Sequence, residues 1–264
     1  MLEFSHKPVM LEECMDGLSL KDGGVWFDGT VGGGGHSFEI LRRTSPSGRL
    51  IATDLDDEAI AAATQRLQPF AGRFTIYKSN YKDFERVFEQ AGVDKIDGAI
   101  LDFGISSHQI DDEERGFSYR MANSPLDMRM DQTSGELSQI IQNSIPAKFR
   151  FGAPCERKTF QALRIEVNGE LDGLYELTLA LTRRLKKGGR IVILTFQSLE
   201  DRIVKEAFRE MQSPCTCPSN FPVCVCGKKA EIKIINKKPI TASEEELKEN
   251  TRSKCAKLRI AEKI

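Results

Sequence analysis

The feature that most constrains the fold is a short apolar strand that ends in an acid and leads directly into a glycine-rich turn. Val25–Asp28 is the expected strand, four glycines follow at Gly32–Gly35, and a helix is expected over Phe38–Arg43. Glycines let a backbone approach a ligand closely, and the N–H groups at a helix start favour a carboxylate or phosphate. The turn therefore predicts a site for a small ligand with an anionic group. A flexible turn without a ligand is the less favoured alternative.

The rest of the chain alternates expected strands with expected helices. The strands are expected at Val25–Asp28, Arg49–Asp54, Phe74–Tyr77, Ile96–Asp102, Arg190–Phe196, Ile232–Ile235 and Lys257–Ala261. The helices include Asp57–Ala63, Tyr81–Ala91, Thr159–Leu185 and Leu199–Met211. This alternation predicts an α/β fold whose mostly parallel sheet has helices on both faces. A closing C-terminal hairpin would make the sheet mixed. Between its two strands, Ser243 with Glu246 predicts a capping box.

Size and composition exclude some classes of protein. The 264 residues suit one large domain, or one domain with a small addition. No apolar run reaches the roughly 18 residues of a membrane span, and the first residues have no secretory pattern. We therefore expect a cytoplasmic protein without a membrane partner. The net charge of −1 does not exclude a nucleic-acid partner, because a basic patch can lie on one face.

Two familiar nucleotide motifs are absent from the glycine turn. The dinucleotide fingerprint needs glycines at i, i+2 and i+5. Counted from Gly32 or from Gly33, the third place holds Ser37 or Phe38. The phosphate loop needs a lysine after its last glycine, where this chain has His36. The sequence therefore argues against a nicotinamide-dependent oxidoreductase.

An acid at the end of the second strand indicates a nucleoside. Asp54 follows Asp28 by 26 residues, close to where a carboxylate accepts ribose hydroxyls in nucleotide-binding sheets. Its alternative role is to cap the next helix, but Asp56 and Asp57 are better placed for that. A ligand with one carboxylate and an adenosine describes S-adenosylmethionine.

The end of the fourth strand holds the candidate catalytic group. Enzymes that methylate amines usually have Asp/Asn/Ser-Pro-Pro-aromatic there, and this chain has Asp102 and Phe103 without the prolines. Asp102 is predicted to accept a hydrogen of the amine and to direct the nitrogen lone pair. Core packing is favoured for Phe103. For Phe117 and Tyr119, core packing and stacking on a base remain equally open.

The segment Gly104–Arg157 is irregular and basic, which makes it the candidate substrate-recognition segment. Cations interleaved with aromatic residues suit a phosphate backbone with splayed bases, although a solvated loop surface has the same composition. The cations here are Arg115, Arg120, Arg129, Lys148, Arg150, Arg157 and Lys158.

Four of the seven cysteines are clustered, and the absence of an export signal indicates mostly reduced thiols. The clustered residues are Cys215, Cys217, Cys224 and Cys226. Two close pairs of thiols can form a tetrahedral zinc site, but the C-x-C spacing departs from the usual C-x₂₋₄-C. The pattern alone therefore favours a surface loop with free or paired cysteines over zinc.

Several long strings together resemble the RsmH/MraW family of small-subunit (16S) ribosomal RNA cytosine-N(4)-methyltransferases. They run over nearly the whole chain: 6–13, 28–30 with 33–37, 101–107, 109–112, 115–118, 125–131, 158–168 and 198–204. The resemblance implies a class I S-adenosylmethionine-dependent methyltransferase with a Rossmann-like, seven-stranded sheet. It also implies methylation of a cytidine in the decoding region, in free RNA or in the assembled small subunit.

The resemblance also implies site residues. The cofactor pocket would comprise Gly34, Gly35, His36, Asp54, Tyr81, Asp102 and Gln109. The RNA-contacting candidates are Arg115, Phe117, Tyr119, Arg129 and Lys158. The implied mechanism is in-line methyl transfer, in which the protein mainly supplies position and orientation. Monomer and homodimer both remain open.

Three departures from the family pattern stand out. A helical insertion usual in the family is largely missing between Asp131 and Gly135, Gln197 replaces a usual histidine, and Phe103 replaces a usual leucine. We therefore expect two halves of one methyltransferase domain, 1–131 and 158–264, around a truncated remnant at 132–157. The alternative function is a cofactor-binding, RNA-associated protein that is catalytically weak or inert.

Overall fold

The computed structural model describes residues 8–104, 140–141, 143–146, 157–218, 223 and 225–264. The chain divides into two compact units: one combines Met1–Phe103 with Gly173–Ile264, and the other is Gly104–Asp172. The predicted domain boundary after residue 131 lies outside the described residues and stays a prediction. Within the described part, no helix has both the length and the apolar character that a membrane span needs.

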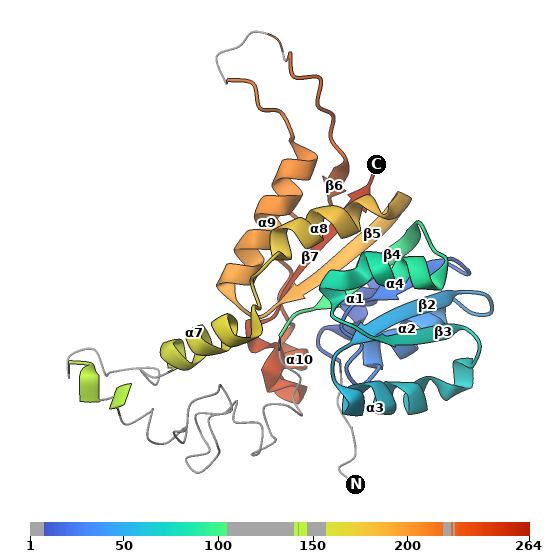
Figure 1. The fold of residues 1–264 in the computed structure, drawn as a ribbon, viewed down its shortest axis with the longest axis horizontal. Coiled ribbons are helices and arrows are strands. Elements are labelled where there is room, and N and C mark those ends of the chain that lie inside the picture. The colour runs from blue at the N-terminus through green and yellow to red at the C-terminus, as the bar shows by residue number, and fades with distance from the viewer. Residues whose placement is uncertain (1–7, 105–139, 142, 147–156, 219–222, 224) are drawn as a thin grey trace. The chain divides into compact units, whose positions relative to one another are not determined.

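A seven-stranded sheet forms the centre of the first unit, in the order β3-β2-β1-β4-β5-β7-β6 (Figure 1). The strands are β1 (Val25–Asp28), β2 (Arg49–Asp54), β3 (Phe74–Lys78), β4 (Ile96–Asp102), β5 (Leu185–Thr195), β6 (Ile232–Ile234) and β7 (Lys257–Lys263). The first five run parallel, and β7 is antiparallel to both β5 and β6. The expected mixed, mostly parallel sheet is confirmed.

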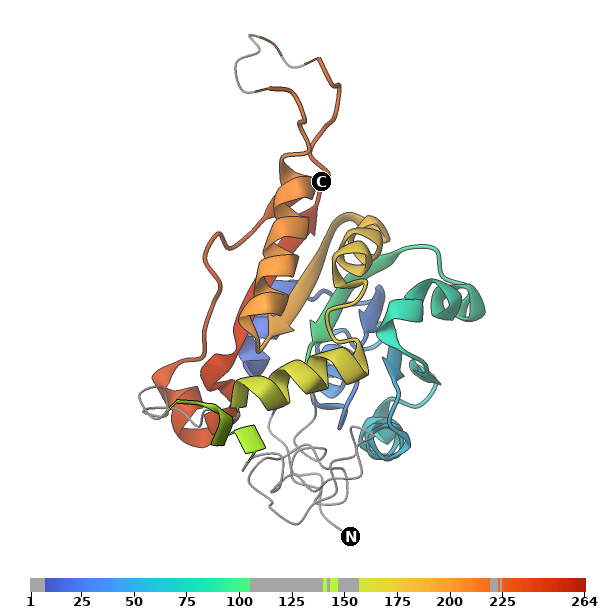
Figure 2. The ribbon, with the colours of Figure 1, turned by 60° about the vertical axis from the view of Figure 1, so that its left-hand side comes forward.

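Helices pack on both faces of this sheet, as the alternation predicts. In the first unit they are α1 (Leu11–Leu18), α2 (Gly35–Arg43), α3 (Asp57–Leu67), α4 (Phe84–Ala91), α8 (Leu174–Arg183) and α9 (Ser198–Gln212). A further short helix, α10 (Glu244–Glu249), lies between β6 and β7 in the chain. Short 3₁₀ turns lie at Gln68–Phe70, Tyr81–Asp83 and Thr251–Cys255. The second unit contains α7 (Arg157–Asn168). The connection between α9 and β6, drawn in orange, extends beyond the end of the sheet in both views (Figures 1 and 2).

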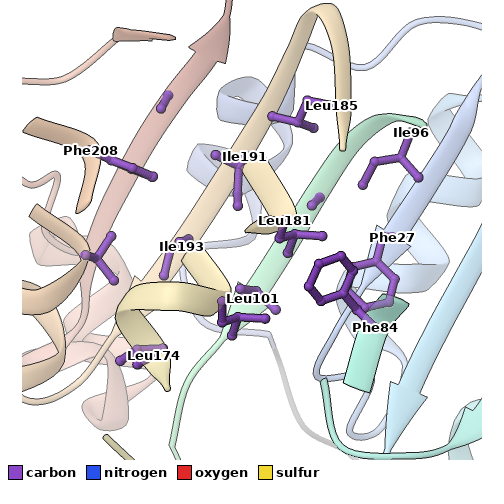
Figure 3. Packing of buried hydrophobic residues seen from close by; sticks show 14 of the residues in the cluster. Phe27, Phe84, Ile96, Leu101, Leu174, Leu181, Leu185, Ile191, Ile193 and Phe208 are labelled. Atoms are coloured by element: carbon purple, nitrogen blue, oxygen red, sulfur yellow. The ribbon is translucent and has the colours of Figure 1, made fainter. Parts of the chain in front are cut away.

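The core has two layers because side chains alternate across each strand. Trp26 and Phe27 are neighbours in β1, and each belongs to a different buried cluster. The Phe27 cluster is closed by α4, α8 and α9 (Figure 3), and the Trp26 cluster by α1, α2 and α3. The sheet is thus held from both sides, which fixes the positions of its strand ends.

One expected element is wrong. The sequence predicts a single helix over Thr159–Leu185, but the structure has α7 and α8, separated by a turn. Gly169 has a φ of +55°, which ends α7, and its N–H donates to the carbonyl of Glu166. Leu185 is already part of β5, where it pairs with Ile96. The helical pattern of apolar residues continues across this turn, which is why the sequence missed it.

The helix expected to begin at Tyr81 starts as a 3₁₀ turn and becomes α-helical only at Phe84. The predicted cap of α10 is confirmed on one side: Ser243 Oγ accepts the N–H of Glu246 at 3.1 Å. The carboxylate of Glu246 in turn accepts the N–H of Met10 at 3.2 Å. Glu246 thus forms a hydrogen bond between α10 and Met10, the residue that precedes α1.

We expect Phe88→Ala to be strongly destabilising. Phe88 is buried between Phe27 and Phe84, with ring centroids 5.1 and 5.3 Å away in edge-on arrangements. Losing this ring leaves a cavity that costs roughly 3–5 kcal/mol of unfolding free energy. Urea unfolding followed by circular dichroism measures the change. Leu55→Ala, at a side chain 61% exposed, is the control, with a change within about 0.5 kcal/mol.

Candidate functional site

Three aspartates lie at the same edge of the sheet. Asp28, Asp54 and Asp102 end β1, β2 and β4, which are neighbouring parallel strands with β1 in the middle. The chain order of the strands reverses between β1 and β4. Ligands of open α/β sheets bind at this position, outside the carboxyl ends of the strands. The three acids therefore lie at the edge of the sheet where a ligand site is expected.

The Asp28 carboxylate holds the turn that follows β1. Asp28 Oδ1 accepts the N–H of Thr30 at 3.0 Å, and Oδ2 accepts the hydroxyl of Ser37 at 2.6 Å. The residue is only 2% exposed, and burial raises its pKa to about 6. Asp28 therefore links the two ends of the glycine turn and has a structural task.

Two of the four glycines are required by the protein's own packing. A Cβ on Gly35 would lie 2.2 Å from Pro8 Cγ, and one on Gly34, where φ is +76°, would lie 3.1 Å from the backbone of Ala63. At Gly32, by contrast, the nearest atom to such a Cβ is the Thr30 carbonyl oxygen, 4.0 Å away. The open side of the turn is thus at Gly32, which the sequence did not single out as a pocket residue.

His36 is neutral in this arrangement. It is buried, and burial lowers its pKa to about 4. Its Nε2 lies 3.1 Å from the carbonyl oxygen of Val9, so the proton of the neutral ring is on Nε2 and donates there. The opposite nitrogen, Nδ1, faces Asp102 Oδ2 at 3.9 Å. This contact is too long for a hydrogen bond, and it is not an ion pair when the imidazole is neutral.

Asp102 carries an oxygen without a partner. Among the described residues, no group hydrogen-bonds its buried Oδ1. Its backbone N–H donates to Thr30 Oγ1 at 2.7 Å, which connects β4 to the glycine turn. Burial raises the pKa of Asp102 to about 7, and the carboxylates of Asp28 and Glu200 add to the shift. A buried polar atom normally has a partner, so this oxygen marks a place where a ligand donor fits.

Asp54 is positioned by backbone groups. Its Oδ2 accepts the N–H of Gly32 at 2.9 Å, and its Oδ1 accepts the N–H groups of Leu55 and Asp56 at 2.8 and 3.0 Å. A carboxylate oxygen accepts more than one hydrogen, so Oδ2 retains capacity for a ribose hydroxyl. As expected, Asp56 caps α3 by accepting the N–H of Glu58.

An aromatic pair lies beside these acids. Tyr81 is half-buried, and its ring centroid is 5.4 Å from that of Phe103. Phe103 itself is buried in the cluster that includes Phe27, so the expectation of core packing for Phe103 is confirmed. Gln197, the departure from the usual histidine, is buried at the start of α9, where its N–H donates to Glu200 Oε2 at 3.1 Å.

Several predicted residues cannot be placed at the site. Those that lie outside the described residues are Gln109, Arg115, Phe117, Tyr119, Arg129 and Cys224. Lys158 is exposed on α7 in the second unit. The structure brings together Gly34, Gly35, His36, Asp54 and Asp102. It adds Thr30, Gly32 and Val9, of which Thr30 and Val9 were already part of the strings that carry the resemblance.

Comparison with known proteins agrees with this geometry. The model of the MraW methylase family matches residues 3–136 and 131–264. The chain belongs to this family. It is 44% identical to the ribosomal RNA small subunit methyltransferase H of Lachnospira eligens, over 100% of this chain and 99% of that protein. The protein of the same name from Clostridium botulinum strain Hall is also 44% identical, with both chains fully covered.

Solved structures confirm the fold of this MraW methylase. TrmN from Thermus thermophilus matches with a TM-score of 0.52 at 12% identity, over 100% of this chain and 51% of that chain. The fold is that of a class I methyltransferase, as expected. The alignment with the Lachnospira protein spans 312 positions, at least 48 more than the 264 residues here, and the two family matches meet at 131–136. This chain is therefore shorter than that relative, and the expected loss of a helical insertion between Asp131 and Gly135 stays a prediction.

Asp102→Asn should stabilise the fold at alkaline pH. The carboxyl group has a folded-state pKa raised from 3.8 to about 7, so its stabilising contribution is present below pH 4 and is lost as pH rises through about 7. The side chain is 27% exposed, which moderates the effect. The variant should gain on the order of 2 kcal/mol at pH 8, and the gain should shrink toward pH 4.

Urea unfolding of both proteins between pH 4 and pH 8 measures this. The exposed Asp57→Asn serves as the matched control, with little change expected at any pH. A gain for Asp102→Asn that is equal at both ends of the pH range contradicts the assigned pKa.

Proposed function

We propose that this MraW methylase transfers a methyl group from S-adenosylmethionine to the exocyclic N4 amine of a cytidine in the decoding region of small-subunit ribosomal RNA. The observation that carries the proposal is the buried Oδ1 of Asp102, which has no hydrogen-bond partner among the described residues and lies beside a glycine turn and a second acid at neighbouring strand ends. The printed names of the relatives, ribosomal RNA small subunit methyltransferase H, support the substrate class.

The chain's residues fit the cofactor. Asp54 would hold the ribose hydroxyls, and Tyr81 would lie near the adenine. The methionine part of the cofactor would lie at the open side of Gly32. The remaining pocket residues are proposed as Gly34, Gly35, His36 and Gln109. When bound, S-adenosylmethionine supplies a methyl group on a positively charged sulfur, and the amine nitrogen takes this methyl and releases one proton to water.

The charges of the site suit a cationic ligand. Asp28, Asp54 and Asp102 place carboxyl groups around the turn, and Glu200 is near enough to raise the pKa of Asp102. His36 remains neutral at physiological pH, because burial lowers its pKa to about 4. The pocket therefore has acids and lacks a charged imidazole at this position, which avoids repulsion of a sulfonium.

Asp102 is proposed as the catalytic residue. When ionised, its free Oδ1 accepts one hydrogen of the amine and so directs the nitrogen lone pair toward the methyl group. A pKa near 7 means that the ionised form becomes dominant just above neutral pH. The group thus acts mainly by orientation, in keeping with a reaction in which positioning dominates.

The proposed RNA contacts come from residues that are not part of the sheet. Arg115, Arg129 and Lys158 would contact phosphates, and Phe117 and Tyr119 would stack on the flipped base. The substrate is proposed to be ribosomal RNA, free or in the assembled small subunit. The catalytically weak or inert alternative rests on the shortening at 131–136.

Asp54→Asn should weaken cofactor binding. The unmodified protein is expected to bind S-adenosylhomocysteine with a micromolar Kd, about −8 kcal/mol. A hydrogen bond to a charged group contributes about 1.5–3 kcal/mol, so the variant should bind roughly 10- to 100-fold more weakly. Isothermal titration calorimetry measures both. Asp57→Asn, three residues away and exposed on α3, should bind as the unmodified protein does. Equal affinities for all three proteins refute the ribose role.

Methyl incorporation tests the activity itself. With labelled S-adenosylmethionine and undermodified small subunits or their free RNA, label should appear at cytidine N4. The rate constant kcat/KM should rise with pH and level off above about 7, because Asp102 must be ionised. Asp102→Asn should lose roughly 100-fold or more and should lack this pH dependence.

The assay also separates the two functions. Cofactor binding without label in either RNA form supports the inert alternative, whereas label in only one form identifies the substrate. Label at another position of the base contradicts the N4 assignment.

A further inference from the structure

Three thiols converge in the connection between α9 and β6, far along the chain from the methyltransferase site. The Sγ atoms of Cys215, Cys217 and Cys226 all lie within 4.8 Å of one another. Cys215 and Cys217 are on the outgoing side of the connection, and Cys226 is on its return. Each C-x-C pair thus supplies at least one thiol to the group, from opposite arms of the connection. The short C-x-C spacing, which argued against zinc, does not prevent the three sulfur atoms from lying close together.

The distances suit a bound ion better than a disulfide. The Sγ atoms of Cys215 and Cys226 are 3.8 Å apart. Two thiolates at 2.3 Å from a tetrahedral zinc ion are separated by about 3.8 Å. A disulfide would need about 2.05 Å. The pair therefore has the separation of two ligands on one tetrahedral centre.

A hydrogen bond to sulfur is a second, independent observation. The backbone N–H of Val225 donates to Cys217 Sγ at 3.4 Å across the connection. N–H groups directed at sulfur stabilise the thiolate, and such bonds are typical of the surroundings of metal-bound cysteines. Gly227, with φ of +65°, turns the chain immediately after Cys226. Both a backbone hydrogen bond and a turn of the chain thus lie next to the cysteine sulfur atoms.

The described part of this connection has exposed apolar side chains. Val223 and Val225 are 70% and 72% exposed, so these apolar side chains are not packed in a core. Its base is fixed, since the N–H of Glu231 donates to the carbonyl of Met211 at 2.8 Å. A metal cross-link between the arms is the kind of device that orders a segment with exposed apolar side chains.

We propose that Cys215, Cys217 and Cys226 bind a structural zinc ion that closes the connection between α9 and β6. Sulfur ligands in tetrahedral arrangement select zinc over harder divalent cations. Binding displaces the thiol protons, so affinity falls as pH is lowered. The assignment uses the three described thiols; Cys224 lies outside the described residues. It is independent of the methyl-transfer proposal.

The test is the metal content of the full-length chain, purified without a metal-affinity step and under reducing conditions. Elemental analysis should find one zinc per chain. Replacement by Co²⁺ should give intense thiolate-to-cobalt charge-transfer bands and the d–d bands of tetrahedral coordination. Cys217→Ser and Cys226→Ser should each lose most of the zinc and these bands. Cys255→Ser, at an exposed cysteine in another part of the chain, should retain both.

Circular dichroism and S-adenosylhomocysteine titration show whether each variant is folded, so that loss of metal is not confused with loss of the domain. Retention of zinc in Cys226→Ser overturns the proposal. So does unmodified protein that contains no zinc, that binds Co²⁺ without charge-transfer bands, or that contains iron with acid-labile sulfide. A Cys215–Cys226 disulfide found by mass spectrometry in the reduced preparation also overturns it.

Discussion

The buried carboxylate of Asp28 is the interaction on which the rest of the site depends. It binds the Thr30 N–H and the Ser37 hydroxyl, and so holds both ends of the turn between β1 and α2. Thr30 then receives the N–H of Asp102, and Gly32 donates to Asp54. One buried acid therefore sets the positions of two others, on two neighbouring strands. Backbone hydrogen bonds from Val31 to Thr53 and from Gly34 to Val31 hold the same turn, and Asp28 adds the side-chain link between its two ends.

Placing acids together has an electrostatic consequence. Burial and the nearby carboxylates of Asp28 and Glu200 keep the pKa of Asp102 near 7, in a range where modest changes in surroundings alter its charge. A cation bound beside Asp102 favours the ionised form, which is the form that accepts an amine hydrogen. Under the proposed mechanism, binding of a sulfonium ligand would therefore favour the form of Asp102 that accepts the amine hydrogen. His36 is neutral at physiological pH because burial lowers its pKa to about 4, so it adds no second positive charge beside Asp102.

Much of this arrangement could be predicted from the sequence, because apolar runs that end in acids are local signals. Ile96–Asp102 was predicted with its observed bounds, and parallel strands bring such ends to one edge. What failed depends on contacts between distant residues. Leu185 was expected at the end of a helix, but it pairs with Ile96 and belongs to strand β5. Likewise, the contact of Pro8 with Gly35 becomes evident only when the N-terminal segment is folded against the turn.

The division of the chain bears on how the missing segment affects function. Asp28, Asp54, His36 and Asp102 all belong to the unit formed by Met1–Phe103 and Gly173–Ile264. The shortening is expected between Asp131 and Gly135, within the other unit, where the two family matches overlap. The four described hydrogen bonds that shape the glycine turn all join residues of the first unit. Under the proposed function, Asp54 and Asp102 act from the first unit, whereas Gln109 and the proposed RNA contacts belong to the second. The shortening should therefore affect RNA affinity more than the cofactor contacts of Asp54.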